Sequence, residues 1–130
     1  MREYVVEFAP FAERHFIRTF AKKYKGAWDI TRRSITEEFL QVELLFLKKT
    51  AETIVVSDDH HIRICKTEFK IAGSQESRHA SGNRCIIAIH TQEAAVRVLL
   101  VYCKGDVAGT GETVWWRQLV KKNYPEYSIL

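Results

Sequence analysis

Apolar positions change their spacing near residue 10, from partial alternation to the spacing of a helix. Residues 2–8 alternate in part and are rich in β-branched side chains, which predicts a strand. Pro10 suits the first turn of a helix, and the lysines just before Gly26 suit its last turn. Between them lie three aromatic residues at intervals of four, Phe16, Phe20 and Tyr24. The pattern predicts a first helix over about residues 10–25.

A second helical pattern follows after a short break and continues to about Lys49. Four apolar residues fall on one face of it, namely Ile35, Phe39, Val42 and Phe46. Two amphipathic helices joined by so short a connection should lie antiparallel as a hairpin. Their apolar faces then need a sheet to cover.

The second half of the chain supplies that sheet. Extended segments are predicted at 53–56, 62–72, 83–90 and 95–104. Loops are predicted at 73–82 and 105–111, followed by a final helix at 112–124. This order indicates a single α+β domain over residues 1–130. We expect an N-terminal strand, an antiparallel helical hairpin packed on a twisted antiparallel sheet of about four strands, and a C-terminal helix.

The predicted strand hairpin at 83–104 is apolar but has basic residues at both ends. Side chains alternate between the two faces of a sheet, so the loop length decides which residues share a face. A three-residue loop at 91–93 would pair Arg84 with Leu100 and would place Arg84, Tyr102 and Lys104 on one face. A two- or four-residue loop would put Arg84 and Lys104 on opposite faces. We favour the three-residue loop.

Positive charge is concentrated around this hairpin. The chain has a net charge of +4, but residues 60–104 contain seven Lys or Arg and only three Glu. One face of the predicted sheet would carry Lys70, Arg84 and Lys104, with His90 beside the turn. Such a cluster repels itself unless a polyanion binds, so it indicates phosphate binding. The alternative is that these are ordinary strand-end charges in water, which contribute little to stability.

Other chemistries find less support. The three cysteines, Cys65, Cys85 and Cys103, lack metal-binding spacing and favour reduced thiols in a cytoplasmic protein. His60 and His61 would point to opposite sides of a strand, so they are a weak metal signal. We expect no metal, no cofactor, no signal peptide and no membrane-spanning segment.

Three segments, EFKIAG, SGNRCIIAIH and VRVLLVYCKGD, resemble the C-terminal half of RelE/ParE-type toxins of bacterial toxin–antitoxin pairs. That family has a basic residue on the first of these strands, matched by Lys70, and one ending the last strand, matched by Lys104. The middle strand opens with a small residue, an aromatic residue and Arg. Residues 82–84 match this step, except that Asn83 replaces the aromatic residue. The resemblance covers residues 66–106.

In the ribonuclease branch of the family, the resemblance implies metal-independent cleavage of mRNA at the ribosome. The 2′-hydroxyl attacks the neighbouring phosphate, and preorganised cations stabilise the charge that develops. The implied catalytic residues are Lys70, Arg84, Lys104 and His90. The implied RNA-binding residues are Lys66, Arg78 and Tyr102.

The general base stays open at this stage. The sequence has no tyrosine soon after Lys104, and Tyr124 and Tyr127 come much later. The candidates are His90, Tyr102, Tyr127 or none of them.

The resemblance also implies a cognate antitoxin protein that holds the toxin inactive. Two other functions remain open. One is a ParE-type toxin that poisons DNA gyrase without cleaving RNA. The other is a non-enzymatic module of the same fold that binds RNA or protein.

Overall fold

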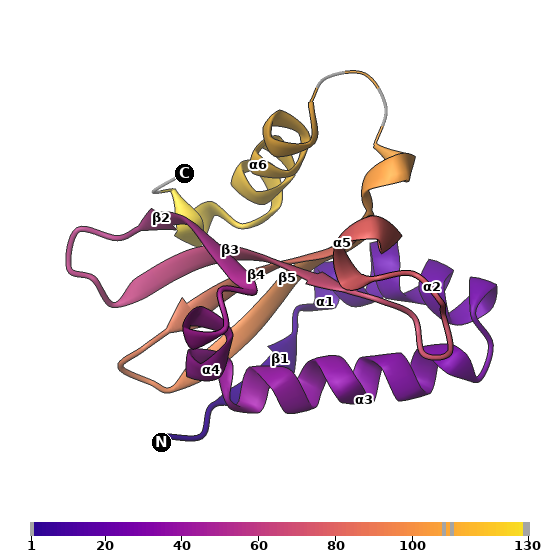
Figure 1. Cartoon of the computed structure of the whole chain (residues 1–130). Coiled ribbons are helices and arrows are strands. Elements are labelled where there is room, and N and C mark those ends of the chain that lie inside the picture. Colours follow the sequence, from indigo (N-terminus) through magenta and orange to yellow (C-terminus); the bar gives the residue numbers. More distant parts are fainter. Residues whose placement is uncertain (1, 108, 110, 129–130) are drawn as a thin grey trace.

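The computed structural model describes residues 2–107, 109 and 111–128. It confirms the α+β class and has one open sheet of five strands in the order β1-β5-β4-β3-β2 (Figure 1). The strands are β1 (Val5–Phe8), β2 (Ala51–Val56), β3 (Ile62–Phe69), β4 (Asn83–His90) and β5 (Ala95–Cys103). Neighbouring strands are antiparallel except for β1, which is parallel to β5.

The prediction of an antiparallel sheet of about four strands is therefore wrong in two respects. After the helices, the strands β2 to β5 step back across the sheet through three reversals, and the last of them lies beside β1. Because β2 runs opposite to β1, the three reversals bring β5 back to the direction of β1. Strand direction depends on this path of the chain, and side-chain periodicity contains no information about it.

The two predicted helices form, and each is interrupted. The first consists of α1 (Pro10–Ala12), the π-helical turn η1 (Glu13–Ile17) and α2 (Arg18–Lys23). The second consists of α3 (Ala27–Leu40) and α4 (Val42–Leu47), because the backbone of Gln41 leaves the helical region. Gly26 separates α2 from α3 and has φ of +76°, a conformation that glycine adopts at little cost.

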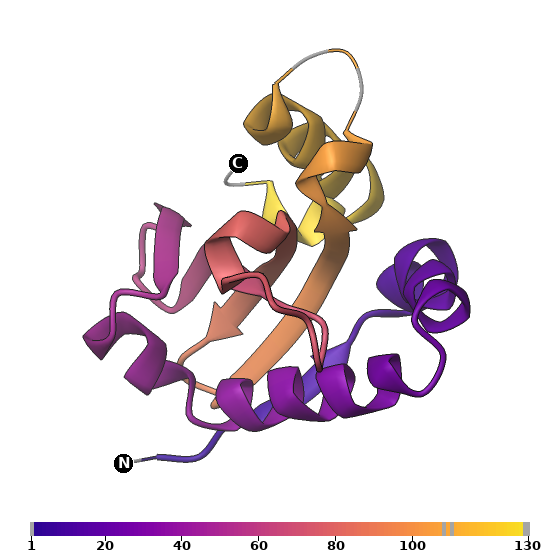
Figure 2. The same ribbon diagram turned by 45° about the vertical axis from the view of Figure 1, so that its right-hand side comes forward.

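Both faces of the sheet are covered. On one face, α3 packs Trp28, Ile35 and Phe39 against strand residues that include Cys85 and Ile87. On the other face lie α6 (Glu112–Asn123) and the 3₁₀ turn η3 (Pro125–Tyr127). Figure 2 shows α3 and α6 on opposite sides of the sheet. An open cationic face was therefore a wrong expectation, since apolar residues of α6 cover most of that face.

The β4–β5 hairpin has a four-residue loop, because His90 pairs with Ala95. On its own, this loop would place Arg84 and Lys104 on opposite faces. A β-bulge at Leu99 inserts one further residue, however, and shifts the register so that Arg84 pairs with Tyr102. The loop length and the pairing of Arg84 with Leu100 were predicted wrongly, whereas the shared face of Arg84 and Tyr102 is confirmed.

The segment predicted as a loop at 73–82 contains a helical turn, α5 (Arg78–Ser81). Ser77 caps its start by accepting a hydrogen bond from the Ala80 backbone N–H, and Gly82 ends it with φ of +76°. The carbonyl of Gly82 accepts a hydrogen bond of 2.7 Å from the backbone N–H of Lys104. Lys104 begins the 3₁₀ turn η2 (Lys104–Asp106), so α5 and η2 lie side by side. None of the helices in the described part of the chain is long and apolar enough to cross a membrane.

Candidate functional site

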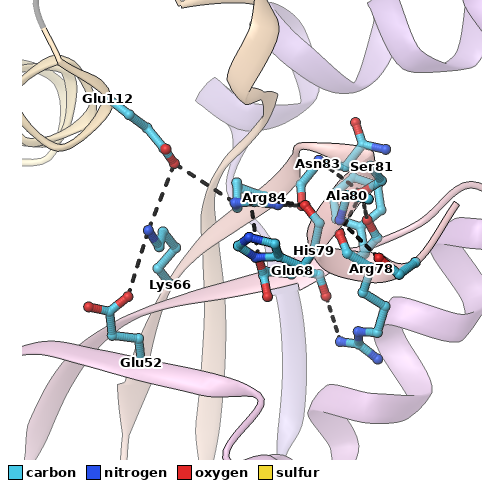
Figure 3. Close-up of polar contacts among 12 residues, drawn as sticks. Glu52, Lys66, Glu68, Arg78, His79, Ala80, Ser81, Asn83, Arg84 and Glu112 are labelled. Carbon is cyan, nitrogen blue, oxygen red and sulfur yellow. Dashed lines mark hydrogen bonds and ion pairs between the residues drawn. The ribbon is translucent and has the colours of Figure 1, made fainter.

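Three neighbouring strands place polar side chains in one row across the sheet. Glu68 on β3 pairs with Arg84 on β4, which pairs with Tyr102 on β5. Directly paired residues point to the same side, here the side that faces α6. Lys66 lies two residues before Glu68 and therefore shares this face. Figure 3 shows the side chains of Lys66, Glu68 and Arg84, together with Glu112 from the start of α6.

Arg84 is the most deeply buried charge in this row, with only 3% of its side chain exposed. Its Nη1 and Nη2 atoms donate to the backbone carbonyls of Asn83 and His79, and Nη2 lies 3.2 Å from Glu68 Oε2. Its Nε is buried and has no hydrogen-bond partner. A buried donor of this kind is costly to leave unsatisfied, which makes Arg84 a strong candidate for binding an anion.

A carboxylate from α6 lies in front of this donor. Glu112 Oε2 is 4.0 Å from Arg84 Nε and 4.0 Å from Lys66 Nζ, which is too far for hydrogen bonds. The same oxygen accepts a hydrogen bond of 2.6 Å from Tyr102 Oη. Burial and the neighbouring Glu112 raise the pKa of Tyr102. Tyr102 is thus held as a proton donor to Glu112 and is poorly suited to act as a general base.

Next to Arg84 lies a cavity of about 280 Å³. Four cationic residues line it, namely Lys49, Lys66, Arg84 and Lys104. Three carboxylates and one histidine also line it, namely Glu52, Glu68, Glu112 and His79. Two of the residues predicted as catalytic, Arg84 and Lys104, therefore lie together with Lys66, which was predicted to bind RNA. The cavity can hold an anion the size of a phosphodiester between lysines at its rim and Arg84 at its floor.

His79 is a residue of this site that sequence reasoning did not single out. Its Nδ1 lies 2.7 Å from Glu68 Oε2, the same oxygen that pairs with Arg84. Its side chain is 83% exposed. The available signal was the sequence SRHASG, in which Ser77 and Gly82 are a helix start and stop one turn apart. That turn directs His79 toward Glu68 on β3.

Lys70 lies outside this cavity. Strand β3 ends at Phe69, and Lys70 lines a separate cavity of about 210 Å³ against α3. The prediction that Lys70 shares a cationic face with Arg84 is therefore wrong, because the strand is three residues shorter than its apolar pattern indicated.

Arg78 is bound within the fold. Its guanidinium donates to both carboxylate oxygens of Glu38 on α3, at 2.5 and 2.9 Å, and to the backbone carbonyl of Glu68 at 2.5 Å. The hydrogen bonds to Glu38 raise the pKa of Arg78. Arg78 thus connects α5 to α3 and β3, which leaves its charge already paired.

His90 lies at the other end of β4, six residues from Arg84, or about 20 Å along the strand. Its Nε2 is 2.8 Å from the hydroxyl of Tyr127. Burial raises the pKa of Tyr127, which is almost fully buried. His90 and Tyr127, both candidates for the general base, therefore bind each other far from the cationic cavity.

Comparison with known proteins adds no assignment to this site. No family model, curated protein or solved structure matches the chain. Within residues 2–107, 109 and 111–128, no group of three His, Cys, Asp or Glu side chains could hold a metal ion. The site combines the buried guanidinium of Arg84, three lysines and the pair formed by Glu68 and His79.

Proposed function

We propose that this protein is a toxin-like endoribonuclease that cleaves mRNA engaged by the ribosome, with a RelE/ParE-like fold. The proposal draws on the resemblance over residues 66–106 and on the order of a strand, a helical hairpin and the meander β2–β5. Its site would be the cavity beside Arg84.

One observation carries the proposal. Arg84 is buried, has an Nε donor without a partner, and adjoins a cavity that three lysines also line. Four cations against three carboxylates give the cavity a formal charge of +1 before His79 is counted. A phosphodiester oxygen would supply the missing acceptor and would be stabilised by the adjacent positive charges.

The proposed reaction needs these groups and no metal. When the 2′-hydroxyl attacks the phosphorus atom, negative charge builds up on the non-bridging oxygens. Arg84 at the floor and Lys66 and Lys104 at the sides would stabilise that charge. Preorganised donors are effective because they need no rearrangement as the charge develops.

The test compares wild type with Lys104→Ala, a change at an exposed residue that should not affect folding. Loss of one preorganised cation should slow cleavage by about 10²–10³-fold. Primer extension on ribosome-engaged mRNA measures the cut ends, and Lys122→Ala, an exposed lysine on α6, is the matched control. Cut ends that depend on Lys104 but not on Lys122 support the ribonuclease.

A gyrase supercoiling assay on the same preparations tests the ParE-type alternative. Inhibition of supercoiling with intact mRNA would overturn the ribonuclease and would assign the cationic cavity another role. Intact mRNA together with normal supercoiling would favour a non-enzymatic binding module.

The proposed function includes a cognate antitoxin. A partner that blocks this cavity must neutralise cations at its rim, such as Lys49 and Lys104, so it should present carboxylates there. Expression of the chain alone should arrest bacterial growth, and co-expression with the product of an adjacent open reading frame should restore it. Normal growth with folded, soluble protein would count against any toxin.

A further inference from the structure

His79 and Glu68 form a carboxylate–histidine pair at the mouth of the cavity. A carboxylate only accepts hydrogen bonds, so Nδ1 of the imidazole carries the proton that bonds to Glu68 Oε2 at 2.7 Å. The neutral ring then has its lone pair on Nε2. This nitrogen makes no hydrogen bond within the described residues, and the side chain is exposed. The pair thus presents a proton acceptor beside the cations.

The backbone that carries His79 is fixed from three directions. Ser77 caps the start of α5, Arg78 binds Glu38 on α3, and Ser81 Oγ lies 2.7 Å from the carbonyl of Phe69 on β3. The carbonyl of His79 itself accepts a hydrogen bond of 3.4 Å from Arg84 Nη2. The imidazole and the buried guanidinium are therefore coupled both through Glu68 and through the backbone. Such support holds a catalytic group in one orientation.

We propose that His79 is the general base of the ribonuclease and that Glu68 is its positioning residue. This inference rests on the proposed function. His79 Nε2 takes the proton from the 2′-hydroxyl while the O2′–P bond forms and the P–O5′ bond breaks. The leaving 5′-oxygen takes a proton from water at the cavity mouth. The products are a 2′,3′-cyclic phosphate end and a 5′-hydroxyl end, and the imidazolium then returns its proton to the solvent.

The other titratable groups around the cavity are less suited to this step. Tyr102 donates its proton to Glu112, and Lys66 lies between the carboxylates of Glu52 and Glu112 as a cation. Glu68 shares one oxygen between His79 and Arg84. Among the described residues that line the cavity, His79 has a nitrogen acceptor without a hydrogen bond, an exposed side chain and a hydrogen-bonded partner at 2.7 Å.

The experiment separates binding from chemistry. Single-turnover cleavage of ribosome-engaged mRNA is measured for wild type and His79→Gly. Binding is measured by co-sedimentation with ribosomes whose mRNA carries a 2′-deoxynucleotide at the cut position and therefore cannot be cleaved. His79→Gly should slow cleavage by about 10²–10⁴-fold and should leave binding of the deoxy substrate unchanged. His60→Asn, an exposed histidine in the β2–β3 turn, is the matched control.

Two further measurements distinguish a catalytic histidine from a structural one. Added imidazole should restore part of the His79→Gly cleavage, because the site is open to solvent. Glu68→Gln should leave the cut positions unchanged but alter the pH dependence of the rate, since an amide no longer stabilises the imidazolium.

If His79→Gly cleaves mRNA at the wild-type rate and with the same pH profile, the inference is overturned, whereas the proposed ribonuclease function is not. Slowed cleavage that imidazole does not restore, accompanied by weaker binding of the deoxy substrate, would also overturn it. Absence of cleavage by wild type would overturn the proposed function itself.

Discussion

At the scale of single residues, Arg84 stabilises the fold as well as the site. As a strand-end cation it was expected to contribute little to stability. Its 3% exposure and its bonds to two backbone carbonyls contradict that expectation. A buried guanidinium that binds Glu68 cannot be removed without leaving groups unpaired. The effect of any Arg84 substitution on cleavage must therefore be compared with its effect on the free energy of unfolding.

Arg84→Ala should lower the free energy of unfolding by about 3 kcal/mol, the cost of breaking a buried, hydrogen-bonded ion pair. Urea denaturation measures this change, and Arg33→Ala on the exposed side of α3 should stay within about 0.5 kcal/mol of wild type. Arg84→Lys retains the charge but loses the forked geometry, so it should fall between them. A loss below about 1 kcal/mol for Arg84→Ala would show that the buried pair is not a major stabilising contact.

At the scale of elements, α5 depends on the glycine that ends it. Gly82 has φ of +76°, and an added Cβ would lie 3.4 Å from Cys103 Sγ. Its carbonyl also holds the backbone of Lys104. A change at Gly82 should therefore move His79 and Lys104 together.

Gly82→Ala should cost about 1–2 kcal/mol, since an L-residue is strained in this region. Gly73→Ala is the control, because Gly73 has φ of +83° and no neighbour within 4 Å of an added Cβ. Both variants should lose similar stability in urea denaturation, but only Gly82→Ala should also slow RNA cleavage. Equal cleavage rates for the two variants would show that the position of α5 does not affect the site.

The start of α6 contributes a second element-scale effect. The Glu112 carboxylate lies 4.0 Å from both Arg84 and Lys66, where a phosphate oxygen would otherwise be attracted. A charge at that distance contributes about 1 kcal/mol in water-like surroundings. Glu112 should therefore weaken anion binding.

Glu112→Gln should bind a short RNA carrying a 2′-deoxynucleotide about three- to tenfold more tightly, because one competing charge is removed. Fluorescence anisotropy at low salt measures the affinity, with Glu37→Gln on the exposed side of α3 as the matched control. An affinity equal to that of the control would mean that Glu112 does not compete with the phosphate.

Sequence patterns predicted elements better than the relations between them. The bounds of β4 are those expected from its apolar run, and the helical hairpin follows its stripe of aromatic residues. The bulge at Leu99 could not be anticipated, because two neighbouring leucines both suit a buried strand. The end of β3 at Phe69 was missed for a similar reason, since the apolar Ile71 continues the pattern and packs in the same core as Phe69, although it lies beyond the strand. These two positions decided which basic residues meet.

At the scale of the whole molecule, the sheet separates two hydrophobic cores. The N-terminal helices complete one core, and the C-terminal elements complete the other. The helical hairpin covers one face, and α6 with η3 covers the other. The inner strands β3, β4 and β5 contribute to both cores, so their backbones are shielded on each side. Cys65 and Cys85 lie in these strands and are fully buried, whereas Cys103 at the end of β5 is partly exposed. Two of the three thiols are thus shielded from solvent, and one is accessible.

Thiol labelling should divide accordingly into two phases. Burial raises the pKa of Cys65 to about 11 and that of Cys85 to about 12, so neither forms a thiolate readily at neutral pH. Native protein should label quickly at Cys103, and Cys65 and Cys85 should react only as fast as the protein unfolds. Mass spectrometry after timed exposure to a thiol reagent counts the labels, and Cys103→Ser should remove the fast phase alone.

Arg84→Ala should accelerate the slow phase, because it destabilises the strand on which Cys85 lies. If the rate of the slow phase is the same in Arg84→Ala, labelling of Cys65 and Cys85 follows a local opening of the sheet. The loss of stability at Arg84 would then not extend to that opening.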